Sequence, residues 1–173
     1  MSDAPAPSLS VSDLFAERAA RRQREREAEE QLQRKQAEEL AAFKQRLDDF
    51  EVTEARVQAL QERIRRAFDR GETELMLTSF PSSFCTDNGR AVNNAGLPPI
   101  NRPDDAEGAA KPREPEWLAT MPKGTRPVYE YWEKHLKPGG FSLGARVLSF
   151  PGGVPGDIGL VLSWPKSAAE GQL

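Results

Sequence analysis

The chain has 173 residues, of which 38% are hydrophobic and 29% charged, and its formal net charge is −3 at pH 7. Basic and acidic side chains are nearly balanced on both sides of Gly71, so neither half has the excess of Lys and Arg that nucleic-acid binding usually needs. A single Cys and a single His exclude an internal disulfide and a zinc site built on cysteines. No apolar run approaches the roughly 20 residues that span a bilayer, and the first residues lack the basic and apolar regions of a signal peptide. We therefore expect a cytoplasmic protein without membrane attachment, metal or cofactor.

The N-terminal part of the chain is predicted to be a tail followed by one long helix. Residues 1–9 contain two prolines and few apolar side chains, which indicates a disordered tail. Between this tail and Gly71 there is no Gly or Pro, which predicts a helix over residues 10–70. Ser10 and Asp13 are placed to cap its start, and Gly71 stands where a glycine commonly ends a helix.

The second half of this helix, at about 40–68, carries an apolar stripe with the 3,4 spacing of a coiled coil. Seven of the nine a and d positions of the heptads are apolar, and the two exceptions are Glu54 and Gln61. A narrow apolar stripe on a lone helix has nothing to bury against, so we expect it to pair with a second copy as a homodimer. Packing against the C-terminal part of the same chain is the alternative. The expected interface residues are Leu40, Phe43, Leu47, Phe50, Val57, Leu60, Ile64 and Phe68.

The first half of the helix has no such stripe but carries a cluster of arginines. Five of them, Arg18, Arg21, Arg22, Arg24 and Arg26, lie within nine residues, and glutamates follow at once. Such a cluster is typical of a solvated charged helix face, which we favour. Contact with nucleic acid through the Arg18–Arg26 patch is the alternative, and it defines a weaker functional hypothesis, a nucleic-acid accessory protein.

Beyond Gly71 the apolar spacing changes, and residues 72–164 predict a small α+β domain in the order β-α-loop-α-β-β. Three strands would form one sheet backed by two helices. The expected elements, in chain order, are a strand at 72–80, a helix at 82–93, a flexible Pro-rich loop at 96–115, a helix beginning at Thr125, strands at 141–150 and 158–164, and a disordered tail at 165–173. The glycine-rich stretch 151–157 is predicted to connect two strands, because it lacks the Lys-Ser/Thr ending of a phosphate-binding loop and no helix follows it.

The only nucleophile with a possible base is Cys85. If Ser82 or Ser83 caps the helix at 82–93, Cys85 lies in its first turn, where the helix dipole stabilises a thiolate. His135 would be the base and Asp87 the acid that orients it. The alternative, which we favour, is that Cys85 is a small core residue and that His135 lies on an apolar helix face.

The same predicted helix is rich in polar side chains, which makes it a candidate surface for an unknown protein partner. The residues concerned are Asp87, Asn88, Arg90, Asn93 and Asn94. The sequence thus favours a non-enzymatic cytoplasmic scaffold or adaptor that self-associates through its coiled-coil helix and presents a small α+β binding domain. A small thiol-dependent enzyme that uses Cys85 and His135 is the alternative.

Overall fold

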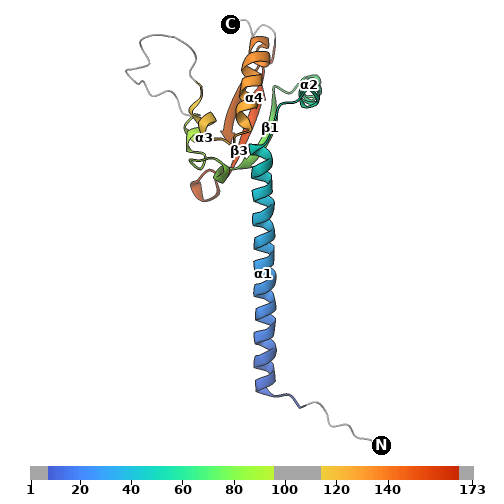
Figure 1. Cartoon of the computed structure of the whole chain (residues 1–173), viewed down its shortest axis with the longest axis vertical. Coiled ribbons are helices and arrows are strands. Elements are labelled where there is room, and N and C mark those ends of the chain that lie inside the picture. Colours follow the sequence, from blue (N-terminus) through green and yellow to red (C-terminus); the bar gives the residue numbers. More distant parts are fainter. Residues whose placement is uncertain (1–7, 96–113, 168–173) are drawn as a thin grey trace, which may run out of the picture. The chain divides into compact units, whose positions relative to one another are not determined.

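The computed structural model describes residues 8–95 and 114–167 and has the predicted α+β architecture, a long N-terminal helix followed by a three-stranded antiparallel sheet with helices (Figure 1). The helices and strands, in chain order, are α1 (Val11–Asp48), α2 (Glu54–Asp69), β1 (Glu74–Pro81), α3 (Arg90–Ala95), α4 (Thr125–Tyr131), β2 (Ser142–Val147) and β3 (Asp157–Ser163). The chain divides into two compact units, residues 1–43 and 44–173, and each is described by itself. Within the described ranges, no helix combines the length and the apolarity required to cross a membrane.

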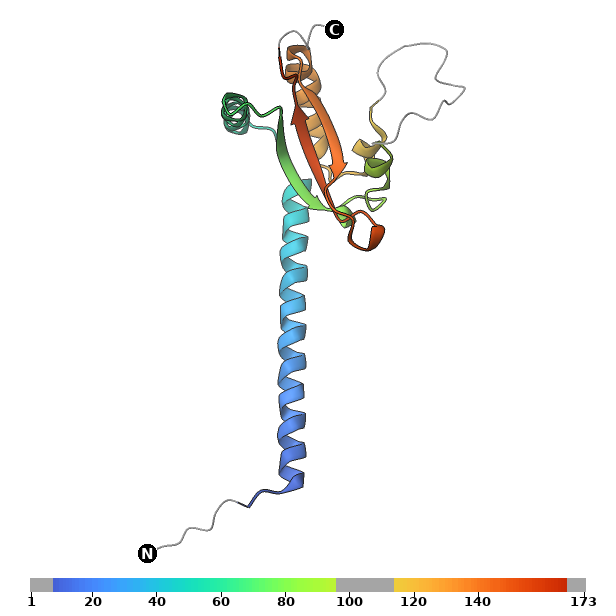
Figure 2. The same ribbon diagram turned by 180° about the vertical axis from the view of Figure 1, so that it is seen from behind.

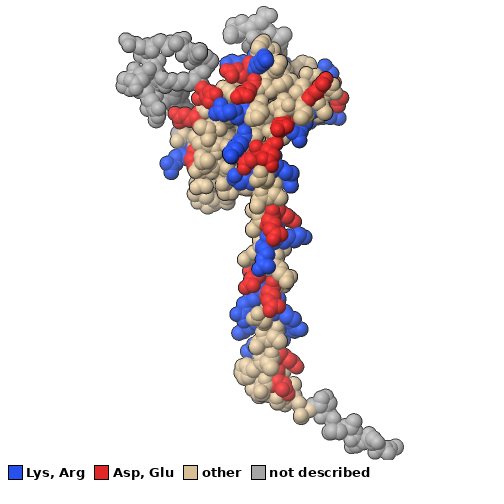
Figure 3. Space-filling view, in the orientation of Figure 1, with Lys and Arg blue, Asp and Glu red and all other residues tan. Residues whose placement is uncertain are grey.

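The first unit consists of most of α1, which begins as the sequence predicts. The backbone N–H of Asp13 donates a hydrogen bond to Ser10 Oγ at 3.0 Å, so Ser10 satisfies one of the free amides at the helix start. With 38 residues, α1 is about 57 Å long. None of its side chains is buried. Basic and acidic side chains alternate along its surface (Figure 3), as expected for a helix solvated on every side.

The prediction of one helix over residues 10–70 is wrong, because α1 ends at Asp48 and α2 starts after a short non-helical segment at 49–53. Thr53 caps α2, since its Oγ1 accepts a hydrogen bond from the backbone N–H of Arg56 at 3.3 Å. The capping hydroxyl therefore favours the start of a new helix at Thr53, although this part of the sequence contains no Gly or Pro.

The end of α2 matches its prediction in detail. Gly71 has a φ of +78°, and its N–H donates to the carbonyl oxygen of Phe68 at 2.9 Å. The N–H of Glu72 donates to the carbonyl oxygen of Ala67 at 3.0 Å. These two bonds and the left-handed glycine form a Schellman motif, which turns the chain from α2 into β1.

The sheet has the strand order β1-β3-β2, so the last strand in the chain is the central one. Leu162 of β3 lies opposite Leu75 of β1 and Leu143 of β2. A bulge between Met76 and Thr78 interrupts the regular pairing of β1. Because side chains alternate between the faces of a strand, this register gathers the large apolar residues on one face.

The core lies between that face and the helices. Ile158, Leu160 and Leu162 are its most deeply buried large side chains. Ile64 of α2 and Leu136 pack with Leu162 in one cluster. Figures 1 and 2 show α2 beside β1 and α4 lying along the sheet, roughly in the direction of the strands. Because Ile64 of α2 and Leu136 both pack with Leu162, α2 and the helical segment that starts with α4 cover the same face.

The helix that begins at Thr125 starts where predicted but does not remain an α-helix. It continues as a π-helical turn, Trp132–Leu136, and a 3₁₀ turn, Lys137–Gly139, and it ends at Gly140 with a φ of +95°. The wider π turn changes the angular spacing of the side chains. As a result Leu136 is buried while His135 is exposed, against the prediction that both lie on one apolar face.

The predicted helix at 82–93 is also wrong in extent. A 3₁₀ turn, Ser82–Phe84, is followed by turns, and the α-helical part is α3 alone. Most of the predicted loop at 96–115 and parts of both predicted tails lie outside the described residues. The glycine-rich stretch does connect β2 to β3, with Gly152 and Gly153 at φ values of +63° and +82°, which are conformations that favour glycine.

Candidate functional site

The structure does not provide the surroundings that an activated Cys85 needs. Its side chain is only 3% exposed, and it follows the Ser82–Phe84 3₁₀ turn instead of lying in the first turn of an α-helix. Burial, together with the charge of Asp87, raises the pKa of the Cys85 thiol to about 11. A thiol in this environment stays protonated at neutral pH and is a poor nucleophile.

Cys85 and His135 also lie toward opposite ends of the central strand. Cys85 closely follows the end of β1 that pairs with Asp157, the first residue of β3. His135 precedes Leu136, which packs on Leu162 near the other end of β3. Five residues of an extended strand span about 17 Å. The exposed His135 ring instead packs against Tyr131 in a tilted arrangement, with 4.9 Å between the ring centroids.

Asp87 has a structural role in the turn before α3. Its Oδ1 accepts a hydrogen bond from the N–H of Gly89 at 3.0 Å, and its Oδ2 accepts one from the N–H of Ala91 at 2.7 Å. Both carboxylate oxygens are therefore used to hold the loop. The other members of the predicted polar surface are exposed to solvent. They are Asn88, Arg90, Asn93 and Asn94.

The residues of the predicted coiled-coil stripe do not form one continuous face, because the break at 49–53 separates them. Ile64 and Leu60 pack into the core of their own domain. Leu40 and Phe68, with exposed fractions of 47% and 63%, remain open to solvent. Part of the stripe thus packs on the same chain, which is the alternative that the sequence left open. Phe43 is half-buried, and the remaining members, Leu47, Phe50 and Val57, line a groove on the second unit.

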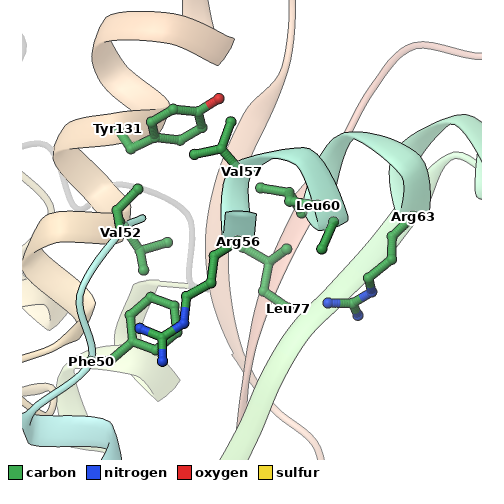
Figure 4. A pocket seen from close by; sticks show the side chains of 10 residues that line it. Phe50, Val52, Arg56, Val57, Leu60, Arg63, Leu77 and Tyr131 are labelled. Atoms are coloured by element: carbon green, nitrogen blue, oxygen red, sulfur yellow. The ribbon is translucent and has the colours of Figure 1, made fainter. Parts of the chain in front are cut away.

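The described residues form an apolar groove made of two adjoining cavities. Its larger cavity, of about 260 Å³, is bounded by α2, the 49–53 segment, β1 and α4 (Figure 4). An adjoining cavity of about 200 Å³ shares Phe50, Leu77 and Val128 with it and extends toward the start of α4. The larger cavity is lined by Phe50, Val52, Arg56, Val57, Ala59, Leu60, Arg63, Leu77, Val128 and Tyr131. Together the two cavities have the size and apolar lining of a ligand or peptide site.

Two arginines of α2 stand on the rim of this groove (Figure 4). Arg56 donates a hydrogen bond to the carbonyl oxygen of Glu51, and its guanidinium carbon lies 4.5 Å from the centroid of the Phe50 ring. Arg63 donates to the carbonyl oxygen of Met76 at 2.9 Å. Each guanidinium has five N–H donors, so these bonds leave donors available for an anion.

A second exposed feature lies at the start of α1. Val11, Leu14 and Phe15 occupy its first two turns and are exposed, Phe15 by 62%. The guanidinium of Arg18 lies over the Phe15 ring, 5.7 Å from its centroid. The arginines of the Arg18–Arg26 patch are exposed as predicted, with Glu25 as the acidic residue among them, and further glutamates follow along the helix (Figure 3).

The comparisons with known proteins add no assignment to these features. No family model matches this sequence, and no curated protein or solved structure is significantly similar to it. Among residues 8–95 and 114–167, no three His, Cys, Asp or Glu side chains are grouped so that they could hold a metal ion.

Sequence reasoning missed the groove, although one local signal for its α2 wall was present. Val52 and Val57 flank the Thr53 cap at the positions of a hydrophobic staple, in which the residue before the cap packs on the fourth residue of the helix. Both valines line the larger cavity. The other walls come from β1 and α4, and their proximity to α2 has no local signature in the sequence.

Proposed function

We propose that this protein is a non-enzymatic cytoplasmic scaffold whose copies associate through α1 and whose α+β domain presents a binding groove. The observation that carries this proposal is α1 itself, a helix of 38 residues in which no side chain is buried. In proteins, most of the stability of a helix comes from packing one of its faces against another surface.

The exposed apolar residues of α1 give association a driving force. Leu14, Phe15, Leu32 and Leu40 are between 44% and 62% exposed. Each large apolar side chain that becomes fully buried contributes about 1.5–3 kcal/mol. In the simplest case the product is a homodimer, which would bind a partner with higher avidity because two domains are held close together.

The state of the single cysteine supports the non-enzymatic and cytoplasmic parts of the proposal. Cys85 is a free thiol, which fits a reducing compartment. Its raised pKa disfavours the thiolate that a thiol-dependent enzyme requires.

The test is the association state of the full chain, measured by sedimentation velocity over a range of concentrations. We expect the average mass to rise with concentration within the micromolar range. Cys85→Ser should show the same rise, because the thiol has no part in association. A wild-type chain that keeps the mass of one copy up to high micromolar concentration contradicts the proposal.

A further inference from the structure

We propose that α1 pairs with α1 of a second copy in the antiparallel direction, with the two-fold axis between residues 23 and 24. This pairing rests on the proposed self-association and adds its direction and register. It uses only residues of the first unit, which form one continuous helix throughout the region concerned.

One stripe of α1 keeps an unbroken spacing of four and three residues over residues 11–36. This is the spacing of the a and d positions of a coiled coil, so these side chains lie along one side of the helix. We call the stripe the α1 seam, and its eight residues are Val11, Phe15, Arg18, Arg22, Glu25, Glu29, Leu32 and Gln36. All eight are exposed, so the whole seam is open to a partner.

The α1 seam is charged at its centre and has large apolar side chains on both sides of the charges. Phe15 and Leu32, which are 62% and 56% exposed, stand next to the charged part. Like charges four residues apart repel each other on an isolated helix. Within the described residues none of the four charged side chains is in an ion pair, so all are available to another chain. They are two basic residues followed by two acidic ones, Arg18, Arg22, Glu25 and Glu29.

Antiparallel pairing about this centre places each charge opposite its complement. A two-fold axis between residues 23 and 24 brings Arg18 opposite Glu29 and Arg22 opposite Glu25. Each contact occurs twice, because the two copies are related by the axis. An arginine bonded to a carboxylate forms a strong, charge-assisted contact, and its aliphatic stem covers neighbouring apolar surface. The four charges that repel in pairs on one helix thus attract across two.

The register is fixed by the apolar pairs and by the order of the charges. The same axis brings Phe15 opposite Leu32 at both ends of the charged centre, where the two side chains bury each other. Moving one helix by seven residues in one direction would bring Arg18 opposite Arg22, and moving it in the other would bring Glu25 opposite Glu29. Neither shifted register is favoured, because each places like charges together at the centre of the interface.

The same charges disfavour a parallel pair. In register, every seam residue would face its own counterpart, which gives four successive layers of like charge. A parallel pair staggered by seven residues would match Arg18 with Glu25, but it would place Phe15 against Arg22. Such a stagger also leaves unmatched seam residues at both ends and does not close into a symmetric dimer.

Variants of the full-length chain test the charge pairing by sedimentation velocity. Arg18→Glu combined with Arg22→Glu makes the centre of the seam entirely acidic. This change should weaken association at least about 30-fold, because attractive contacts become repulsive ones. The matched control, Arg24→Glu combined with Arg34→Glu, changes the net charge equally on the opposite side of α1 and should associate like wild type. Circular dichroism verifies that each variant remains helical.

Exchanging all four signs separates complementarity from the sign of each charge. A chain that carries Glu25→Arg and Glu29→Arg in addition to the two arginine substitutions has two acidic residues followed by two basic ones. Every antiparallel contact is then restored with its signs exchanged, so association should return to that of wild type.

The direction of pairing is measured by pulsed electron paramagnetic resonance on a spin label at residue 38. The label is attached to Glu38→Cys in a Cys85→Ser background, and residue 38 lies on the side of α1 away from the seam. In the antiparallel pair the two labelled positions are about 45 Å apart along the axis. In a parallel pair in register they are separated only across the two helices, by less than about 30 Å.

Four outcomes overturn the inference while the proposed function stands. They are wild-type association by the acidic variant, a loss of association in its matched control, a folded sign-exchanged chain that does not associate, and spin labels closer than about 30 Å. A wild-type chain that remains a single copy at high micromolar concentration overturns both.

Discussion

Replacing Gly124 with alanine tests the packing that fixes the end of α1 against the start of α4 inside the second unit. A Cβ atom at this position would overlap the carbonyl oxygen of Leu47, and it would lie 2.7 Å from the Cβ of Phe50. Gly124 has ordinary helical dihedral angles, with φ −68° and ψ −9°. The cost of the substitution therefore comes from the close approach alone and not from backbone strain.

The magnitude follows from what has to move. Adding a methyl group to a well-packed site costs about 1–3 kcal/mol, and the upper end applies here because the obstructing atom belongs to the backbone. Moving that backbone would also disturb the hydrogen bond from the N–H of Lys123 to Asp48 Oδ1, which has a length of 2.9 Å and contributes about 1 kcal/mol. We expect a loss of about 3–4 kcal/mol, which corresponds to a fall in Tm of about 10–15 °C for a domain of this size.

The fluorescence of Trp117, Trp132 and Trp164 reports unfolding, since all three lie in the second unit. Gly144→Ala is the matched control, because a Cβ at Gly144 has no atom within 4 Å. We expect this control to unfold within about 0.5 kcal/mol of wild type. If Gly124→Ala unfolds within about 1 kcal/mol of wild type, the close approach at Leu47 is not a feature of the folded protein.

Three further predictions concern stability and reactivity. The backbone N–H of Lys123, together with Lys44, lowers the pKa of Asp48. The stability that this carboxylate provides is therefore present above its ordinary pKa of 3.8 and is lost as the pH falls through its lower folded value. In urea titrations, Asp48→Asn should lose less stability than wild type over this acidic range. Burial raises the pKa of Cys85 from 9.0 to about 11. The stability that its neutral thiol provides is therefore fully present below about pH 9 and is lost as the pH rises through about 11. Iodoacetamide should label the native thiol far more slowly than the denatured one, and equal rates would contradict its burial. Ile64→Ala should lower the free energy of unfolding by about 2–4 kcal/mol, because Ile64 is a core residue. Leu40→Ala, at an exposed position, should change it by less than about 0.5 kcal/mol. A larger loss from Leu40→Ala than from Ile64→Ala would contradict the burial of these two side chains in the structure.

Much of the fold could be predicted because its signals are local. Gly71 predicted the end of α2, since a left-handed residue is needed there and glycine adopts that conformation without cost. The alternation that begins at Phe141 predicted a strand at 141–150, and the structure has β2 over the shorter span Ser142–Val147, with Leu143, Ala145 and Val147 half-buried on one face. The sheet order was not predicted, because the pairing of β3 with both β1 and β2 depends on contacts between distant segments.

The break between α1 and α2 was missed for a different reason. The residues around Thr53 tolerate a helix, and the apolar spacing resumes after them, so the sequence indicated no break at this point. In the structure, the apolar residues after the break gain more by covering the sheet than by continuing α1. Leu60 and Ile64 consequently belong to the core and not to an interface, and tertiary packing overrides local propensity.

The sequence did not indicate that the residues lining the groove come together in one place. Phe50, Leu77 and Val128 line both cavities but come from three separate segments. In the sequence each is an ordinary apolar residue of a stripe, a strand or a helix. Only the folded arrangement leaves the space between them unfilled.

The hydrogen bond from Arg63 to the carbonyl oxygen of Met76 has a consequence for how this sheet meets other chains. β1 is an outer strand, and such strands are templates on which a foreign strand can add by main-chain pairing, the route to amyloid. A side chain occupies the Met76 acceptor, α2 lies alongside the strand, and the neighbouring bulge breaks the even spacing that a newcomer would need. The regular addition of a foreign strand along this part of β1 is thereby disfavoured.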